Sequence, residues 1–252
     1  MLMNAPLAGK VALVTGAGKN IGRALALRLA ADGAAIVVNG RSDEAAIKAV
    51  AEEITAAGGR AMAYRADITK PEEVAAMANA VAASFGGVDI LVTNAGLRRQ
   101  TSFLDMSFAE WREILSVALD GAFIITQAFA QQMIARGGGS IIGLSGISTH
   151  VGTPNRAHVS ASKSGLEGLM RALAVELAPK GIRANCVAPG AVDTVRGASA
   201  GSMPSTLADN GIPMRRRATV AEIADVVRML AGPEGGYITG QTIHVNGGAF
   251  LT

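Results

Sequence analysis

The chain has 252 residues, of which 50% are hydrophobic and 17% are charged, so it can bury a large core in one α/β domain or at most two. Its net charge is only +3 and its basic residues are scattered, apart from the run Arg215 to Arg217, which argues against a nucleic-acid partner. No uninterrupted apolar run approaches the roughly 18 residues of a membrane-spanning helix, and the first residues do not resemble a signal peptide. The single Cys186 fits a reducing compartment, so we expect a cytoplasmic protein without a membrane partner.

The chain begins with a predicted strand, a glycine-rich turn and a predicted helix. The apolar run 11–14 suits a strand that is buried on both faces of a parallel sheet. From Ile21 to Leu29 the apolar residues recur at helical spacing, so Gly16 to Gly22 must turn the chain between the two elements. Such a turn points free N–H groups and the positive end of the helix outward, where a phosphate can bind. The alternative is an ordinary turn that needs glycine only for its dihedral angles.

Strand-like and helix-like segments then alternate to the end of the chain. Strands are expected over residues 36–40, 61–68, 89–96, 140–146, 183–190 and 242–248. Helices are expected over 44–57, from Pro71 onward, and over 107–136, 155–178 and 220–230. This alternation predicts one doubly wound parallel sheet of the α/β class, with ligands bound beyond the carboxyl ends of its strands.

Six short motifs are spread along the chain. They are TGAGKNIG (15–22), Asp67-Ile68, NAG (94–96), SASK (160–163), GIRANCVAPG (181–190) and ITGQTIHVNGG (238–248). Together they resemble the short-chain dehydrogenase/reductase family, and most closely its 3-oxoacyl-carrier-protein reductase type, over about Lys10 to Gly248. The resemblance implies a Rossmann fold for the whole of 1–252 and an NAD(P)-dependent oxidoreductase that acts on a small carbonyl or alcohol substrate.

The resemblance also implies which residues bind the dinucleotide. The turn would hold the pyrophosphate with Gly16, Lys19, Asn20, Ile21 and Gly22. Asp67 and Ile68 would flank the adenine, Asn94, Ala95 and Gly96 would lie beside the ribose, and Pro189, Gly190, Val192 and Thr194 would hold the nicotinamide amide. Asn20 replaces the second glycine of the family, and the turn can survive this change because asparagine tolerates left-handed dihedral angles.

The charge at the end of the second predicted strand bears on the choice of cofactor. NAD-preferring proteins place a carboxylate there, which binds the ribose 2′-hydroxyl. Here Gly40 occupies that position, followed by Arg41, and Lys19 lies in the turn. A guanidinium can bind a 2′-phosphate with two hydrogen bonds. We therefore expect NADP(H) rather than NAD(H), although Arg41 could instead only face solvent.

Most of the catalytic residues that the resemblance implies are missing. The family uses a serine, a tyrosine four residues before a lysine, that lysine, and an asparagine in the preceding long helix. Only the lysine, Lys163, is present, and the other positions fall on Gly146, Val159 and Ala118. None of these three side chains can donate a hydrogen bond, so ordinary ketone reduction should be very weak or absent.

Several substitutes for the missing donors have to be considered. His158 precedes the tyrosine position, and histidine is a residue type suited to proton transfer, although we favour the interpretation that it has no catalytic role. Strand alternation should turn Ser145 away from the site. Lys163 can be catalytic or can serve only to bind the nicotinamide ribose, and we favour the second interpretation. No metal site is expected.

Three classes of function therefore stay open. The first is an NADP(H)-dependent oxidoreductase with unconventional donors, the second is a catalytically silent nucleotide-binding sensor or subunit, and the third is a non-redox enzyme that reuses the cleft. The small, polar segment at about 195–211 predicts a lid over a substrate cleft. Weakly charged, alanine-rich helix faces in 107–136 and 155–178 predict a homotetramer or homodimer.

Overall fold

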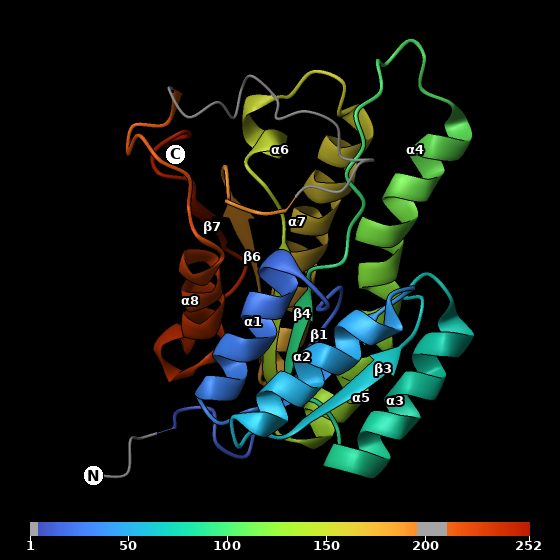
Figure 1. Cartoon of the computed structure of the whole chain (residues 1–252), viewed down its shortest axis with the longest axis vertical. Helices are drawn as coiled ribbons and strands as arrows, with labels where there is room; N and C mark the ends of the chain where they lie inside the picture. The colour runs from blue at the N-terminus through green and yellow to red at the C-terminus, as the bar shows by residue number, and fades with distance from the viewer. Residues whose placement is uncertain (1–4, 196–210) are drawn as a thin grey trace.

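The computed structural model describes residues 5–195 and 211–252, whose strands form one parallel sheet (Figure 1). The strands are β1 (Val11–Val14), β2 (Ala35–Gly40), β3 (Ala61–Arg65), β4 (Ile90–Thr93), β5 (Gly139–Leu144), β6 (Ile182–Pro189) and β7 (Thr242–Val245). They lie in the order β3-β2-β1-β4-β5-β6-β7, and each neighbouring pair is parallel. From β1 the chain adds β2 and β3 on one side of the sheet, and then β4 to β7 on the other side, so the strand order reverses between β1 and β4. The predicted doubly wound α/β fold is therefore confirmed.

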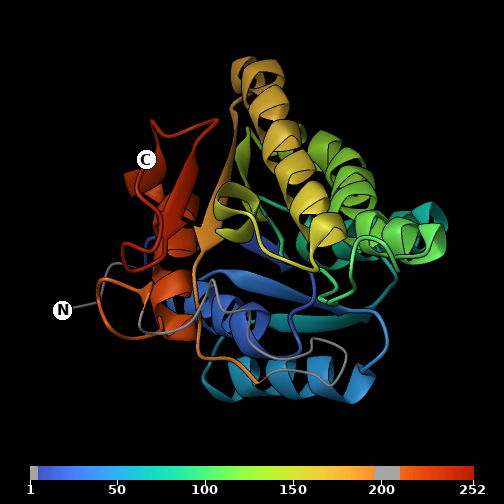
Figure 2. The same cartoon turned by 90° about the horizontal axis from the view of Figure 1, so that it is seen from above.

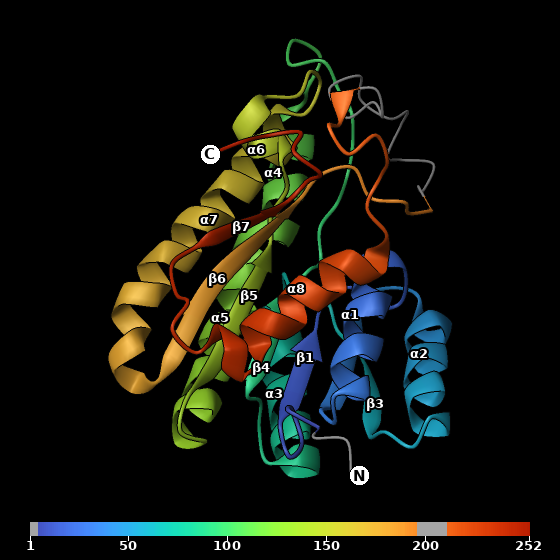
Figure 3. The ribbon, with the colours of Figure 1, turned by 90° about the vertical axis from the view of Figure 1, so that its left-hand side faces the viewer.

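Helices cover both faces of this sheet. They are α1 (Asn20–Ala31), α2 (Glu44–Ala56), α3 (Pro71–Phe85), α4 (Phe108–Leu115), α5 (Gly121–Ala135), α6 (Ser148–Val151), α7 (Ala157–Leu177) and α8 (Val220–Ala231), with a π-helical turn η1 (Ser116–Asp120) and the 3₁₀ turns η2 (Ala178–Lys180) and η6 (Pro233–Gly235). Helices α1, α2 and α8 pack on one face, and α3, α5 and α7 pack on the other (Figures 2 and 3).

The central strands are buried on both faces, as their continuous apolar runs predict. No residue of β1 is more than 4% exposed. Ala12 and Val14 pack in the core under α1, α2 and α8, whereas Val11 and Leu13 pack in the core under α3, α5 and α7. This two-sided packing fixes the sheet rigidly, and the chain segments that leave the carboxyl ends of β1 and β4 are therefore held at one place on its rim.

Several elements end earlier than the sequence predicts. Strand β3 ends at Arg65 rather than at residue 68, β4 at Thr93 rather than 96, and β7 at Val245 rather than 248. The reason is visible after β4, where the N–H groups of Asn94 and Ala95 donate to Thr15 Oγ1 at 3.0 and 2.9 Å instead of to a neighbouring strand. The residues between the strands and these predicted ends therefore form the rim of the sheet.

The segment α4–η1–α5 requires a correction on membrane spans. Residues Phe108–Ala135 form one helical stretch that is long and apolar enough, by length and composition alone, to cross a membrane. The sequence expectation considered only uninterrupted apolar runs and therefore missed this stretch. In its most apolar window 44% of the residues are buried inside the protein, where α5 packs against α3 and the sheet.

Candidate functional site

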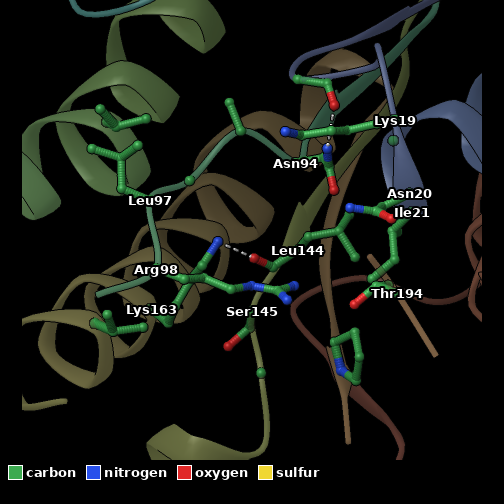
Figure 4. Close-up of a pocket in the computed structure, with 18 of the residues that line it drawn as sticks. Lys19, Asn20, Ile21, Asn94, Leu97, Arg98, Leu144, Ser145, Lys163 and Thr194 are labelled. Atoms are coloured by element: carbon green, nitrogen blue, oxygen red, sulfur yellow. Dashed lines mark hydrogen bonds between the residues drawn. The ribbon is translucent and has the colours of Figure 1, made fainter. Parts of the chain in front are cut away.

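A cavity of about 450 Å³ opens at the carboxyl ends of the strands, beside the point where the strand order reverses (Figure 4). Each residue predicted to bind the dinucleotide lines this cavity. These residues are Gly16, Lys19, Asn20, Ile21, Gly22, Arg41, Asp67, Ile68, Asn94, Ala95, Gly96, Lys163, Pro189, Gly190, Val192 and Thr194. The fold thus brings together residues that lie far apart in the sequence, and the most distant pair, Gly16 and Thr194, is separated by 178 positions.

The glycine-rich turn has no room for larger side chains. Gly16 has a left-handed φ of +62°. A Cβ on Gly22 would lie 2.2 Å from the carbonyl oxygen of Gly16 and 2.7 Å from Asn94 Nδ2, closer than real contacts allow. The turn therefore brings bare backbone to the amino end of α1, and this arrangement fits the pyrophosphate of a dinucleotide.

Asn94 joins the turn to the rim of β4. Its Nδ2 donates to the carbonyl oxygens of Thr15 and Gly16 at 2.8 and 3.1 Å. The Thr15 hydroxyl in turn accepts from the N–H groups of Asn94 and Ala95. These four hydrogen bonds therefore fix the glycine-rich turn to the residues that follow β4.

Asn20 has the left-handed conformation that its position requires, with φ +50°. Its side chain also has a role that the sequence reasoning missed. The amide Nδ2 donates to the carbonyl oxygen of Val195 at 2.9 Å, and Oδ1 accepts from the Val195 N–H at 3.0 Å. Asn20 thus ties the glycine-rich turn to the loop after β6 across the cavity. The predicted lid at 195–211 lies almost wholly outside the described residues.

The end of the cavity that holds Arg41 has the charge pattern used to predict the cofactor. Arg41 Nη1 lies 4.0 Å from Asp67 Oδ2, and about half of the Arg41 side chain is exposed. A Cβ on Gly40 would lie 2.8 Å from Ile47 Cγ2, so the packing leaves little room for an acidic side chain at this position. Lys19 and Arg41 both line the cavity, and a 2′-phosphate would meet two positive charges.

Lys163 lies at the other end of the cavity. Its Nζ donates to the carbonyl oxygen of Leu144 at 2.5 Å, as the dashed line in Figure 4 marks. Burial of the amine, and then the positive charge of Arg98, lower the pKa of Lys163 to about 8. A Cβ on Gly96 would lie 3.4 Å from Nζ, so the amine lies against the segment expected beside the ribose.

The three positions that lack family donors lie in the lining of the cavity or next to it. Gly146 and Val159 line the cavity, and Val159 precedes Lys163 by one turn of α7. Ala118 is buried in the π-helical turn η1, near Gly96. Sequence reasoning missed one nearby hydroxyl, because Ser148 Oγ lies 3.9 Å from the Cβ position of residue 146 and Ser148 also lines the cavity. Only the contact distance reveals this serine, since it follows the expected position by two residues.

The three histidines all lie outside the lining of this cavity. His158 is fully buried, its Nδ1 accepts from the Val159 N–H at 3.0 Å, and its Nε2 therefore carries the proton that it donates to Glu110 Oε1 at 3.2 Å. His150 Nε2 lies 3.0 Å from Glu167 Oε1, and His244 packs edge-on against His150. This geometry does not support His158 as a substitute proton donor, because its proton points away from the cavity.

Glu167 is also the hydrogen-bond partner of Ser145. The Ser145 hydroxyl donates to Glu167 Oε1 at 2.5 Å, but Ser145 also lies in the lining of the cavity, where strand alternation had not placed it. Among the residues that the structure describes there is no group of three or more side chains able to hold a metal ion.

Two arginines at the same end of the cavity also escaped the sequence reasoning. Arg98 reaches into the cavity from the loop after β4 (Figure 4), and Arg156, only 5% exposed, lines it from the start of α7. Spacing gave one usable signal, since Arg156, Val159 and Lys163 recur at helical intervals and so share one face of α7.

Comparison with known proteins agrees with this site. A family model described as "Enoyl-(Acyl carrier protein) reductase" matches residues 16–249. The chain is 39% identical over 243 residues to the 3-oxoacyl-[acyl-carrier-protein] reductase FabG of Staphylococcus epidermidis, covering 96% of this chain and 99% of that protein.

Two solved structures from Burkholderia cenocepacia J2315 superpose closely. A short chain dehydrogenase in complex with NADP has a TM-score of 0.88 and 35% identity, covering 97% of this chain and 99% of that one. A gluconate 5-dehydrogenase in complex with NADP and tartrate has a TM-score of 0.89 and 33% identity, covering 98% and 97%. Fold, motifs and near full-length matches agree, and the chain belongs to the short-chain dehydrogenase/reductase family.

Proposed function

We propose that this protein binds NADP(H) in the cavity and is an oxidoreductase whose reduction of ordinary ketones is weak. The observation that carries the proposal is the contrast between the two ends of one cavity. At one end, the glycine turn, Lys19 and Arg41 match the phosphates of the cofactor. At the other, Gly146 and Val159 offer no donor to a reacting oxygen.

The described residues have separable roles in this proposal. Backbone N–H groups of the turn and the amino end of α1 bind the pyrophosphate, and Arg41 binds the 2′-phosphate. Lys163 holds the nicotinamide ribose from the base of the cavity. The cofactor, when bound, supplies or accepts a hydride. The Ser148 hydroxyl is the neutral side chain best placed to donate to a developing oxyanion, because it lies beside the Gly146 position.

The decisive experiment compares cofactor binding with turnover. We expect NADPH to bind more tightly than NADH by about 1–3 kcal/mol, the range of charge-assisted hydrogen bonds, and Arg41→Ala to remove most of this preference. Arg65→Ala is the matched control, since Arg65 ends the neighbouring strand and pairs with Glu44 outside the cavity. Equal affinities of the unmutated protein for NADPH and NADH in calorimetry would contradict the proposed cofactor.

The rate of cofactor turnover distinguishes between the three classes of function that the sequence left open. A screen of ketones and alcohols that follows cofactor absorbance should give rates far below those of a relative with all four family residues. Loss of the residual rate in Ser148→Ala would support an oxidoreductase with an unconventional donor. Absence of any turnover, with NADPH binding intact, would favour a nucleotide-binding sensor or subunit, or a non-redox enzyme that reuses the cleft.

We also propose that the protein is a cytoplasmic homotetramer or homodimer assembled through α4, α5 and α7. Large apolar side chains are exposed on these helices, with Phe108 77%, Phe123 50% and Val175 81% exposed. Gly168 on α7 has no neighbouring atom within 4 Å of its Cβ position, so a second helix could approach closely there. Ala174, by contrast, packs in the core of its own protomer and does not belong to this surface.

A further inference from the structure

The charged residues that line the cavity are unevenly distributed. The described lining contains the cations Lys19, Arg41, Arg98, Arg156 and Lys163, and its single carboxylate is Asp67. Asp67 lies beside Arg41 at the end assigned to the 2′-phosphate. The reacting end therefore combines Arg98, Arg156 and Lys163 without a carboxylate among the described lining residues.

These positive charges act on the same small volume. The charge of Arg98 contributes to the lowered pKa of Lys163, so the two groups lie close enough to interact. Arg156 begins the helix face that continues with Val159 and Lys163. Its guanidinium is almost completely removed from water, where an anion interacts with it more strongly than at the surface.

A hydrogen-bond network holds the two arginine-bearing segments together. The Thr101 N–H, three residues after Arg98, donates to the carbonyl oxygen of Asn155 at 3.0 Å. The Thr101 hydroxyl donates to Glu110 Oε1 at 2.5 Å, and the same carboxylate oxygen accepts from His158. The backbone segments that carry Arg98 and Arg156 are therefore held together by the fold, which reduces the ordering that a ligand would have to impose.

We propose that the reacting end of the cavity selects a small carboxylate, an oxo acid or the corresponding hydroxy acid, which Arg98 and Arg156 bind. The planar guanidinium matches a carboxylate with two parallel hydrogen bonds. A neutral ketone offers no such partner, so the three cations discriminate by charge. The inference rests on the proposed function, because the dinucleotide would occupy the end of the cavity that holds Lys19 and Arg41 and the carboxylate would bind at the other end.

The test is calorimetric titration of the protein–NADP⁺ complex with three acid and ester pairs: pyruvate, acetoacetate and 4-oxopentanoate, each against its methyl ester. We expect at least one acid to bind about tenfold or more tightly than its ester, as charge-assisted hydrogen bonds predict. Arg98→Met and Arg156→Met should each reduce this preference, and sodium chloride should weaken binding of the acid but not of the ester. Arg112→Met is the control, because Arg112 lies on α4, pairs with Asp120 and does not line the cavity.

The outcomes separate this proposal from the one it rests on. If NADP⁺ does not bind, the proposed function fails, and the same pairs titrated into the protein alone still report whether the arginines prefer acids. Equal binding of acid and ester in all three pairs would overturn the carboxylate proposal, as would an acid preference that survives in the Arg98→Met, Arg156→Met double variant. Inorganic phosphate binding more tightly than every acid would also overturn it, in favour of a phosphate ligand. If Arg156→Met does not fold, Arg98→Met and the salt dependence decide the question.

Discussion

The amine of Lys163 connects the pH of the solution to ligand binding. Its pKa is lowered to about 8, first by burial and then by Arg98, while the nearby Cys186 stays neutral because burial raises the pKa of its thiol to about 12. As the pH rises through about 8, Lys163 loses its proton and one positive charge leaves the reacting end. Arg98 and Arg156 remain charged, so the loss is partial.

We therefore expect the affinity for the acid probes to be highest below pH 8 and to fall by several-fold, short of abolition, between about pH 7 and 9. Calorimetry of the protein–NADP⁺ complex over this range measures the effect. In Lys163→Met the step should disappear, because the titrating group is gone. An unchanged affinity across this range in the unmutated protein would show that Lys163 does not contribute charge to the ligand.

The residues at 146 and 159 can be tested by restoring the missing donors. Gly146 has space for a side chain, since the nearest atoms to its Cβ position are 3.9 and 4.0 Å away. Val159→Tyr with Gly146→Ser should raise ketone reduction by about 10²-fold or more, because a general acid contributes about 10²–10⁴ and Lys163 is in place to lower the tyrosine pKa. Val159→Phe with Gly146→Ala is the control of equal shape without hydroxyl groups.

The readout of that experiment is the initial rate at saturating NADPH. No gain over the Phe and Ala control would mean that something other than the missing hydroxyl groups limits the reaction, for example the absence of asparagine at Ala118. Ser148 already supplies a hydroxyl near residue 146, so most of the gain should come from Val159→Tyr alone.

At the scale of the elements, the glycine-rich turn depends on backbone contacts that tolerate no side chain at residue 22. Gly22→Ala would place a Cβ 2.2 Å from the Gly16 carbonyl oxygen, so the turn must shift. NADPH affinity should fall by about tenfold or more, since even one lost hydrogen bond to a charged phosphate has this effect. Gly168→Ala, on the open face of α7, is the control and should leave NADPH binding unchanged. Tight NADPH binding by a folded Gly22→Ala protein would place the phosphates elsewhere.

The elements also show what local sequence can predict. Strand β1 was predicted with its observed bounds, and α1, α2 and α8 were predicted to within a few residues, because buried apolar runs, glycine turns and caps act over short distances. The strand ends were placed too late, because Asn94 and Asp67 look like strand residues, whereas the Asn94 N–H donates to Thr15 Oγ1 and the Asp67 N–H donates to Glu73 Oε2. The short helix α6 and the π-helical turn inside the predicted helix 107–136 carry no local signal of this kind.

The candidate site likewise contains residues that the sequence could suggest and residues that it could not. The residues predicted to bind the dinucleotide belong to motifs whose order along the chain resembles a family, and the fold brings them to one cavity. Arg98 could not be predicted, because its place in the lining depends on the course of the loop after β4, whereas Arg156 had only its helical spacing from Val159 and Lys163 as a signal. His158 illustrates the opposite error: its position in sequence suggested the cavity, and the orientation of its ring is set by Glu110 of α4.

For the whole molecule, the open face of α7 offers a direct test of assembly. Gly168→Trp should leave the fold of the protomer intact, because nothing within its own chain lies within 4 Å of that Cβ position. If α7 packs against a second copy, the bulky side chain should reduce the mass measured by light scattering at micromolar concentration. Ala75→Trp on the exposed side of α3 is the control and should not change the mass. An unmutated protein that is already a monomer would contradict the proposed oligomer.

The Asn20 side chain is hydrogen-bonded to the Val195 backbone on the opposite side of the cavity. A glycine at residue 20, the residue implied by the family, could form the turn but could not hold the Val195 backbone through a side chain. Here two hydrogen bonds from the Asn20 side chain anchor the chain that leaves β6 to the glycine-rich turn. A displacement of the turn would therefore pull on the Val195 backbone, so a single side chain couples these two walls of the cavity.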